Sequence, residues 1–188
     1  TKVKRKLFSG LSITADIGKL GIGQIVDYED KQAFSAHLLF LERIQFSGEI
    51  GRGIIAPEQA FDNVTYESDG SYLRFGLDYQ IKVKSKNFIS FGFRKATAEY
   101  SDKGTVLIVS ESDLSENYVR TFSRNALSAD WWEFVIITET KLTPVITDKK
   151  VSVFRKALDN FYFGLNYRVR FLLDYSSQEG IDTYTIPG

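Results

Sequence analysis

Hydrophobic and polar residues alternate along two long stretches of the chain, from Tyr72 to Val83 and from Phe161 to Tyr175. A period of two places successive side chains on opposite faces of a β-strand, and a helix cannot use this pattern. Weaker copies of the alternation occur in five further segments. The sequence therefore predicts an all-β protein, with additional strands over Leu7–Ile17, Phe34–Phe40, Ile44–Ile54, Phe88–Tyr100 and Asn125–Thr140.

The connections between these strands alternate between long and short. Long ones lie near residues 19–31, from Pro57 to Gly70 and from Ser101 to Arg124, whereas tight ones lie at Arg43 and at Ser85–Asn87. This alternation is typical of antiparallel up-and-down barrels of the bacterial outer membrane, in which short periplasmic turns oppose longer external loops. We therefore expect both termini on the periplasmic side and a first strand that runs outward.

The seven predicted strands are an odd number, which indicates one more strand. A single-chain bacterial barrel closes with an even number of strands, so we expect an eighth, descending strand to follow Gly188. The connection from Lys141 to Asp159 is long although it falls on the periplasmic side. An alternative is that it contains an additional strand around Val145, Val151 and Val153, which would change the register of everything after it. The chain has no methionine, even at position 1, and we expect that a signal peptide has been removed.

The two faces of the predicted strands differ in polarity. One face is a continuous run of Leu, Ile, Val, Phe and Tyr, whereas the other carries charges with Gly76, Gly92 and Gly164 between them. In a soluble, lipocalin-like barrel the charged face would meet water, and these glycines would have no obvious purpose. In a small membrane barrel the charges line a narrow lumen, where glycines make room for long side chains and opposite charges pair.

We therefore expect residues 1–188 to form a single outer-membrane β-barrel domain, an antiparallel up-and-down transmembrane barrel. The predicted lumen charge network comprises Asp16, Glu49, Arg74, Asp78, Arg94, Glu133, Arg168 and Arg170, and the predicted lipid-facing residues include Leu73, Phe75, Leu77, Tyr79, Phe161, Phe163, Leu165 and Tyr167.

The charges of the connections also differ between the two sides. The predicted external loops are mostly acidic, with Glu67, Asp69 and Asp102 among their residues, whereas the predicted periplasmic segments are mostly basic, with Arg43 and Lys86. A soluble barrel has no reason to sort its charges in this way. The sorting therefore favours a membrane protein.

Composition narrows the function classes. The 24 Lys and Arg residues balance the 24 Asp and Glu residues, so no net charge points to nucleic acid. Cysteine is absent, which excludes disulfides, thiolate metal sites and cysteine nucleophiles. The longest apolar runs are about four residues, where a spanning helix needs about 20. The aromatic content, which includes Trp131 and Trp132, suits strands and an interfacial belt.

Four short motifs carry a family resemblance. They are the segments Tyr66–Tyr79, Phe91–Arg94, Ala129–Glu133 and Tyr184–Gly188, and together the chain is similar to the uncharacterised outer-membrane β-barrel proteins of Bacteroidota, a domain-of-unknown-function family. The resemblance implies a location more than an activity. It also implies that the Ile-Pro-Gly element precedes a last strand. The long, Val-rich segment Leu142–Leu158 departs from the compact turn that the family pattern leads us to expect.

Candidate chemistry is sparse. His37, the only histidine, is predicted on the inner face near Ser35 and Glu49, which permits a Ser-His-Glu arrangement of the kind used in acyl transfer. A hydrogen-bonded histidine in the lumen network is the simpler interpretation. The carboxylates Asp78, Glu49 and Glu133 are more simply explained as partners of lumen arginines than as acid or base catalysts. We expect no catalytic residue, cofactor or metal site.

The resulting hypothesis is a non-catalytic barrel of the bacterial outer membrane, acting as a structural or accessory subunit. Its expected partners are outer-membrane lipid, lipopolysaccharide and other outer-membrane proteins, contacted through the periplasmic segment Leu142–Asp159, and not nucleic acid. The alternatives are a narrow pore or small-ligand transport barrel, a lipid-modifying barrel enzyme centred on His37, and a soluble lipocalin-like binder.

Overall fold

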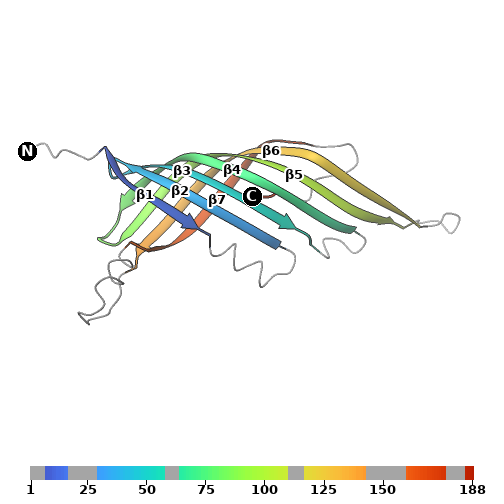
Figure 1. Ribbon diagram of the computed structural model, residues 1–188, viewed down its shortest axis with the longest axis horizontal. Coiled ribbons are helices and arrows are strands. Elements are labelled where there is room, and N and C mark those ends of the chain that lie inside the picture. The colour runs from blue at the N-terminus through green and yellow to red at the C-terminus, as the bar shows by residue number, and fades with distance from the viewer. Residues whose placement is uncertain (1–6, 17–28, 58–63, 110–116, 143–159, 177–184) are drawn as a thin grey trace, which may run out of the picture.

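A computed structural model describes residues 7–16, 29–57, 64–109, 117–142, 160–176 and 185–188. These residues form one antiparallel sheet of seven strands, each hydrogen-bonded to the next along the chain (Figure 1). The predicted all-β, up-and-down architecture is therefore confirmed. The strands are β1 (Phe8–Ala15), β2 (Glu29–Phe40), β3 (Ile44–Ile55), β4 (Val64–Lys82), β5 (Asn87–Ile108), β6 (Tyr118–Lys141) and β7 (Tyr162–Tyr175).

Three strands are much longer than the alternation predicts. Half of the expected loop Pro57–Gly70 belongs to β4, and more than half of the expected loop Ser101–Arg124 belongs to β5 and β6, so the predicted bounds of these loops were wrong. On β4 the outward side chains of the extension are polar, Glu67 and Asp69 among them, so the apolar alternation ends before the strand does. Backbone pairing continues beyond the apolar positions, for example between Val64 and Val106.

The sheet is strongly curled but not closed into a barrel. Neighbouring strands lie about 4.8 Å apart, so a flat sheet would separate β3 from β7 by about 19 Å. Yet Arg168 of β7 lies 2.7 Å from Glu49 of β3, and Arg74 of β4 lies 2.9 Å from Glu133 of β6. The sheet therefore forms a deep trough whose two edges, β1 and β7, are not paired with each other.

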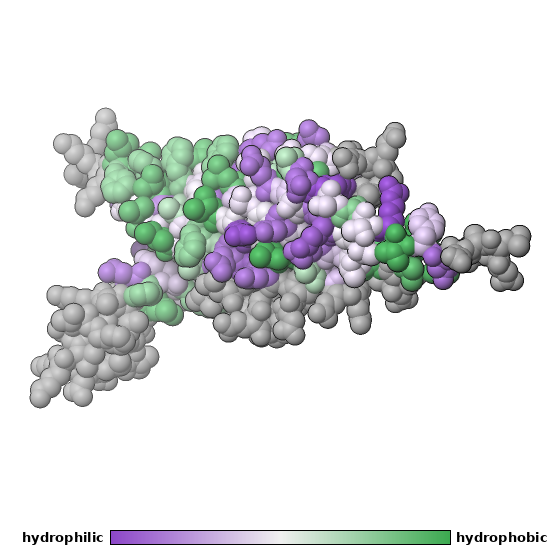
Figure 2. Space-filling view, turned by 45° about the vertical axis from the view of Figure 1, so that its right-hand side comes forward, coloured by the Kyte–Doolittle hydropathy of each residue, from purple (hydrophilic) through white to green (hydrophobic). Residues whose placement is uncertain are grey.

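The two faces of the trough have opposite character. The concave face, which carries Glu49, Arg74 and Glu133, is buried, while large apolar side chains of the convex face are exposed. Figure 2 shows that apolar side chains gather toward the end with the short turns, and that hydrophilic ones lie toward the end where β5 and β6 extend. No helix capable of crossing a membrane occurs among the described residues.

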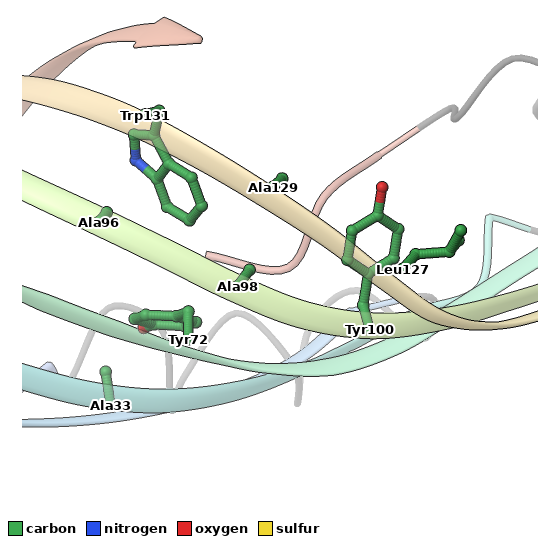
Figure 3. Packing of buried hydrophobic residues seen from close by; sticks show 8 residues of the cluster. All are labelled: Ala33, Tyr72, Ala96, Ala98, Tyr100, Leu127, Ala129 and Trp131. Carbon is green, nitrogen blue, oxygen red and sulfur yellow. The ribbon is translucent and has the colours of Figure 1, made fainter. Parts of the chain in front are cut away.

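A cluster of buried aromatic and alanine side chains lies inside the trough (Figure 3). Ile186 packs against it, so the short segment 185–188 lies on the concave face. The possible extra strand near Val145, Val151 and Val153 falls outside the described residues. The cluster comprises Ala33, Tyr72, Ala96, Ala98, Tyr100, Leu127, Ala129 and Trp131.

Candidate functional site

A buried ion-pair network crosses the trough and is the candidate site. Its centre is Arg74 on β4, which donates from Nη1 to Glu49 and from Nε to Glu133 Oε1 at 2.9 Å. From β7, Arg168 donates from Nη2 to Glu49 Oε2 at 2.7 Å. Trp131 donates from its indole nitrogen to Glu133 Oε1 at 2.7 Å. These contacts connect β3, β4, β6 and β7 across the concave face.

A second group continues the network toward the short turns. Arg94 Nη2 lies 2.9 Å from Asp78 Oδ2, and Ser47 donates its hydroxyl to the same oxygen. Arg94 Nη1 also lies 3.9 Å from Glu49 Oε2, which joins the two groups. Because guanidinium and carboxylate groups alternate through the network, each buried charge faces at least one opposite charge.

His37 belongs to this second group and not to the arrangement considered from the sequence. Its Nδ1 lies 3.1 Å from the hydroxyl of Ser47, its directly opposite neighbour on β3. Ser35 is two residues away on the same strand, opposite Glu49. The described contacts of His37 therefore fit the simpler interpretation, a histidine hydrogen-bonded within a polar network.

The network carries one more cation than anion. It combines the carboxylates of Glu49, Asp78 and Glu133 with four arginines, the fourth being Arg170 on the edge strand β7. Arg170 Nε lies 3.2 Å from Glu133 Oε1, and its side chain is 46% exposed, whereas Glu133 is fully buried. The open end of the network thus lies at the unpaired edge of the sheet.

The structure brings together seven of the eight residues predicted for the lumen charge network. The eighth, Asp16, directly follows β1 at the other edge and is partly buried. Asp174, which continues the polar face in the sequence, lies opposite Asp130 after a register shift between Asp130 and Trp131. Asp130 pairs with Lys95 at 3.5 Å, and that pair lies away from the network.

A further buried pair was missed from the sequence because its residues fell in an expected loop. Arg124 donates from Nε to Asp102 Oδ1 at 2.7 Å, and the Tyr66 hydroxyl donates to Asp102 Oδ2 at 3.0 Å. Burial raises the pKa of Tyr66 to about 12, and the nearby carboxylate adds to the effect. The side-chain hydrogen bond to Asp102 raises the pKa of Arg124. The sequence did carry one signal for this pair. Asp102 follows Arg94 by an even number of positions along β5, so an extended strand would place both side chains on the same face.

Glycines on the concave face leave the space that these side chains fill. A Cβ atom at Gly76 would overlap Arg94, and one at Gly92 would overlap the carboxylate of Asp78. Gly48, on the convex face of β3, has no atom within 4 Å of its Cβ position. Small residues are therefore needed at Gly76 and Gly92 for steric reasons that do not apply at Gly48.

The convex face is apolar across the curl of the sheet. Trp132 stacks on Phe93 there, with ring centroids 4.7 Å apart, while the adjacent Trp131 is only 3% exposed on the concave face. Every residue predicted to face lipid is exposed, by between 45% and 70% of its surface; these are Leu73, Phe75, Leu77, Tyr79, Phe161, Phe163, Leu165 and Tyr167.

Within the described part of the chain no group of three or more His, Cys, Asp or Glu side chains is placed to hold a metal ion. The arrangement instead fixes strands that are distant in the sheet relative to one another. It also fills the trough with side chains.

The comparisons with known proteins give a family without an activity. No curated protein and no solved structure matches the chain. The family model of a domain of unknown function, DUF6048, matches residues 1–188. The match covers the whole chain, which therefore belongs to the DUF6048 family.

Proposed function

We propose that this chain is a transmembrane β-barrel of the bacterial outer membrane with a structural or accessory role and no catalysis. One observation carries the proposal: the polarity of the sheet is inverted relative to a soluble protein. Arg74 and Glu133 are fully buried on the concave face, whereas Phe75 and Leu165 are exposed on the convex face. A continuous apolar surface of this kind is matched by lipid and not by water.

The length of the apolar surface along the strands also supports a lipid environment. The apolar outward positions run from Leu73 on β4 to Val83, the residue that follows this strand, and Ser71 and Asp69 beyond Leu73 are polar. Ten residue steps at about 3.3 Å, tilted by about 45°, span roughly 23 Å, close to the apolar band of about 25 Å on outer-membrane barrels. Near this end of the apolar run, Lys95 lies opposite Phe75, and its ammonium is 5.7 Å from the ring of Trp132, a combination typical of interfacial residues.

Closure of the trough is part of the proposal. The backbone groups at the free edges of β1 and β7 cannot remain unpaired in lipid, where each unsatisfied group costs several kcal/mol. An eighth strand that pairs with both edges would satisfy them and would give the even number that bacterial barrels have. It would also cover Arg170, which is exposed at the edge.

The filled interior favours a structural role over transport. Paired guanidinium and carboxylate groups occupy the centre of the trough, so the closed barrel would hold a polar core and not an aqueous channel. Lipid and lipopolysaccharide are the proposed surroundings, and other outer-membrane proteins are the proposed partners. A source among the Bacteroidota belongs to the same proposal, as does contact through residues 142–159, most of which lie outside the described part.

Heat modifiability combined with membrane fractionation tests the proposal. The full-length protein should be recovered with the outer membrane, and boiled and unboiled samples should differ in mobility on SDS gels. Planar bilayers should show no conductance, and a His37→Ala strain should keep wild-type lipid A. A soluble monomer without a mobility shift would overturn the membrane assignment, whereas steady conductance would replace the structural role with transport.

A further inference from the structure

The segment Thr185–Gly188 occupies a recess of the concave face. Pro187 is fully buried, and Gly188 is buried beside it. The Tyr66 hydroxyl oxygen, which donates its proton to Asp102, lies 3.5 Å from the backbone oxygen of Thr185. Ile186 packs against the buried aromatic and alanine cluster, and Figure 3 shows the C-terminal ribbon running among those side chains. Each of the four residues therefore packs against or is buried by the trough.

Arg74 forms one wall of the recess and anchors the segment. It donates from Nη2 to the backbone oxygen of Gly188, so all three guanidinium nitrogens are engaged, the others with Glu49 and Glu133. The guanidinium carbon also lies 4.1 Å from the centroid of the Tyr72 ring. The segment thus supplies a hydrogen-bond acceptor to the arginine at the centre of the ion-pair network.

The recess fits a glycine at its innermost position. Gly188 has a φ of +110°, which side-chain-bearing residues rarely adopt. A Cβ atom there would lie 3.0 Å from the Tyr72 ring and 3.2 Å from the Trp131 ring. Both the conformation and the space therefore select glycine.

Strand β3 contributes a small-residue wall. A Cβ atom at Gly51 would overlap the Tyr72 ring, so that glycine lets the ring lie against the strand. A Cβ atom at Gly53 would lie 3.7 Å from Cβ of Pro187, which is ordinary van der Waals contact. Strands β3, β4 and β6 therefore all contribute to the part of the recess that holds the proline and glycine of the segment.

We propose that residues 185–188 are an inward-folded plug and that Tyr72, Arg74 and Trp131 form its binding site. The plug seals the trough beside the ion-pair network, and docking completes the hydrogen bonds of Arg74. Its role in closing a lumen rests on the proposed function, because only a closed barrel has a lumen. Docking itself does not depend on the membrane.

A disulfide trap tests docking directly, because residues 1–188 contain no cysteine. Cβ atoms 3.7 Å apart match the separation of about 3.5–4.5 Å in disulfides. The variant Gly53→Cys/Pro187→Cys should therefore cross-link under mild oxidation, with a mobility change on non-reducing gels that reductant reverses. The matched control Gly48→Cys/Pro187→Cys should stay reduced, because position 48 is on the convex face of the same strand.

A second variant keeps Pro187. In a Trp132→Phe background the tryptophan fluorescence comes from Trp131 alone. Gly188→Val should displace the segment, expose Trp131 to water and raise the quenching of its fluorescence by aqueous iodide several-fold. The control variant Gly48→Val should leave this quenching unchanged. Equal cross-linking of the two cysteine pairs, or unchanged quenching in Gly188→Val, would overturn the plug. Cross-linking in a protein that shows no heat-dependent mobility shift would retain the plug and reject the membrane barrel, so the two failures are distinguishable.

Discussion

Neutralising Glu49 should destabilise the fold more than any change to an exposed charge. Its carboxylate accepts hydrogen bonds from Arg74, from Arg168 at 2.7 and 3.2 Å and from the Tyr72 hydroxyl at 3.2 Å, and it lies 3.9 Å from Arg94. In Glu49→Gln, one oxygen becomes an amide donor that faces guanidinium donors. The network, which already has one excess cation, would lose a further anion.

The expected cost follows from burial. Removing one partner from a buried ion pair costs about 3–5 kcal/mol, because the remaining charge is left without compensation. Since about 1.4 kcal/mol is a factor of ten, the folding equilibrium constant should fall by roughly 10²–10⁴. The assay is urea unfolding in lipid vesicles, followed by tryptophan fluorescence and by the heat-dependent gel shift.

A matched control separates the network from charge in general. Asp69→Asn removes the partner of Arg52 in an ion pair at 2.7 Å whose side chains are 35% and 66% exposed. Solvent screens such pairs, so this variant should leave the unfolding midpoint unchanged within error. If Glu49→Gln and Asp69→Asn shifted the midpoint equally little, the network would not hold the trough together.

Three further predictions concern other parts of the molecule. Burial raises the pKa of Tyr66 to about 12. Between pH 10 and 12 the folded state therefore keeps the phenol proton that the unfolded state loses, so the free energy of unfolding should fall across that window. The difference in ultraviolet absorbance between wild type and Tyr66→Phe should show one phenol that titrates near pH 12 and not near pH 10. Gly92→Val should abolish the heat-dependent gel shift by overlapping Asp78, whereas Gly48→Val should retain it, and equal behaviour would contradict the steric argument. Leu77→Arg should lower stability in vesicles by about 2–4 kcal/mol if that position faces the bilayer midplane, and an unchanged urea midpoint would place it in water.

The sequence predicted the strands where one face is apolar and failed where neither face is. Alternation located Leu73 to Val83 because the outward positions there are apolar and the inward ones are mostly polar. It could not extend β4 back to Val64, since Glu67 and Asp69 face outward beyond the apolar surface and are held by backbone pairing. Strand ends set by a hydrogen-bonded ladder leave no periodic signal in side-chain polarity.

The charged face could be predicted, but the partners within it could not. Glu49 is directly opposite Arg74 on the neighbouring strand, a pairing that depends on register. Its contact with Arg168 depends on the curl of the whole sheet, which brings β7 over β3. The register shift beside Trp131 moved Asp174 away from the polar face, and a bulge of this kind has no marker in the alternation.

The central claim, lipid outside and charge inside, is tested most directly by the two adjacent tryptophans. Trp132 is on the convex face, stacked on Phe93, and Trp131 is buried on the concave face, with its indole nitrogen bonded to Glu133. Each can be observed alone, in Trp131→Phe and in Trp132→Phe, after the gel shift has verified folding. In vesicles of brominated lipid, Trp132 should be strongly quenched and Trp131 should not, and quenching of Trp132 by aqueous iodide but not by brominated lipid would contradict the account.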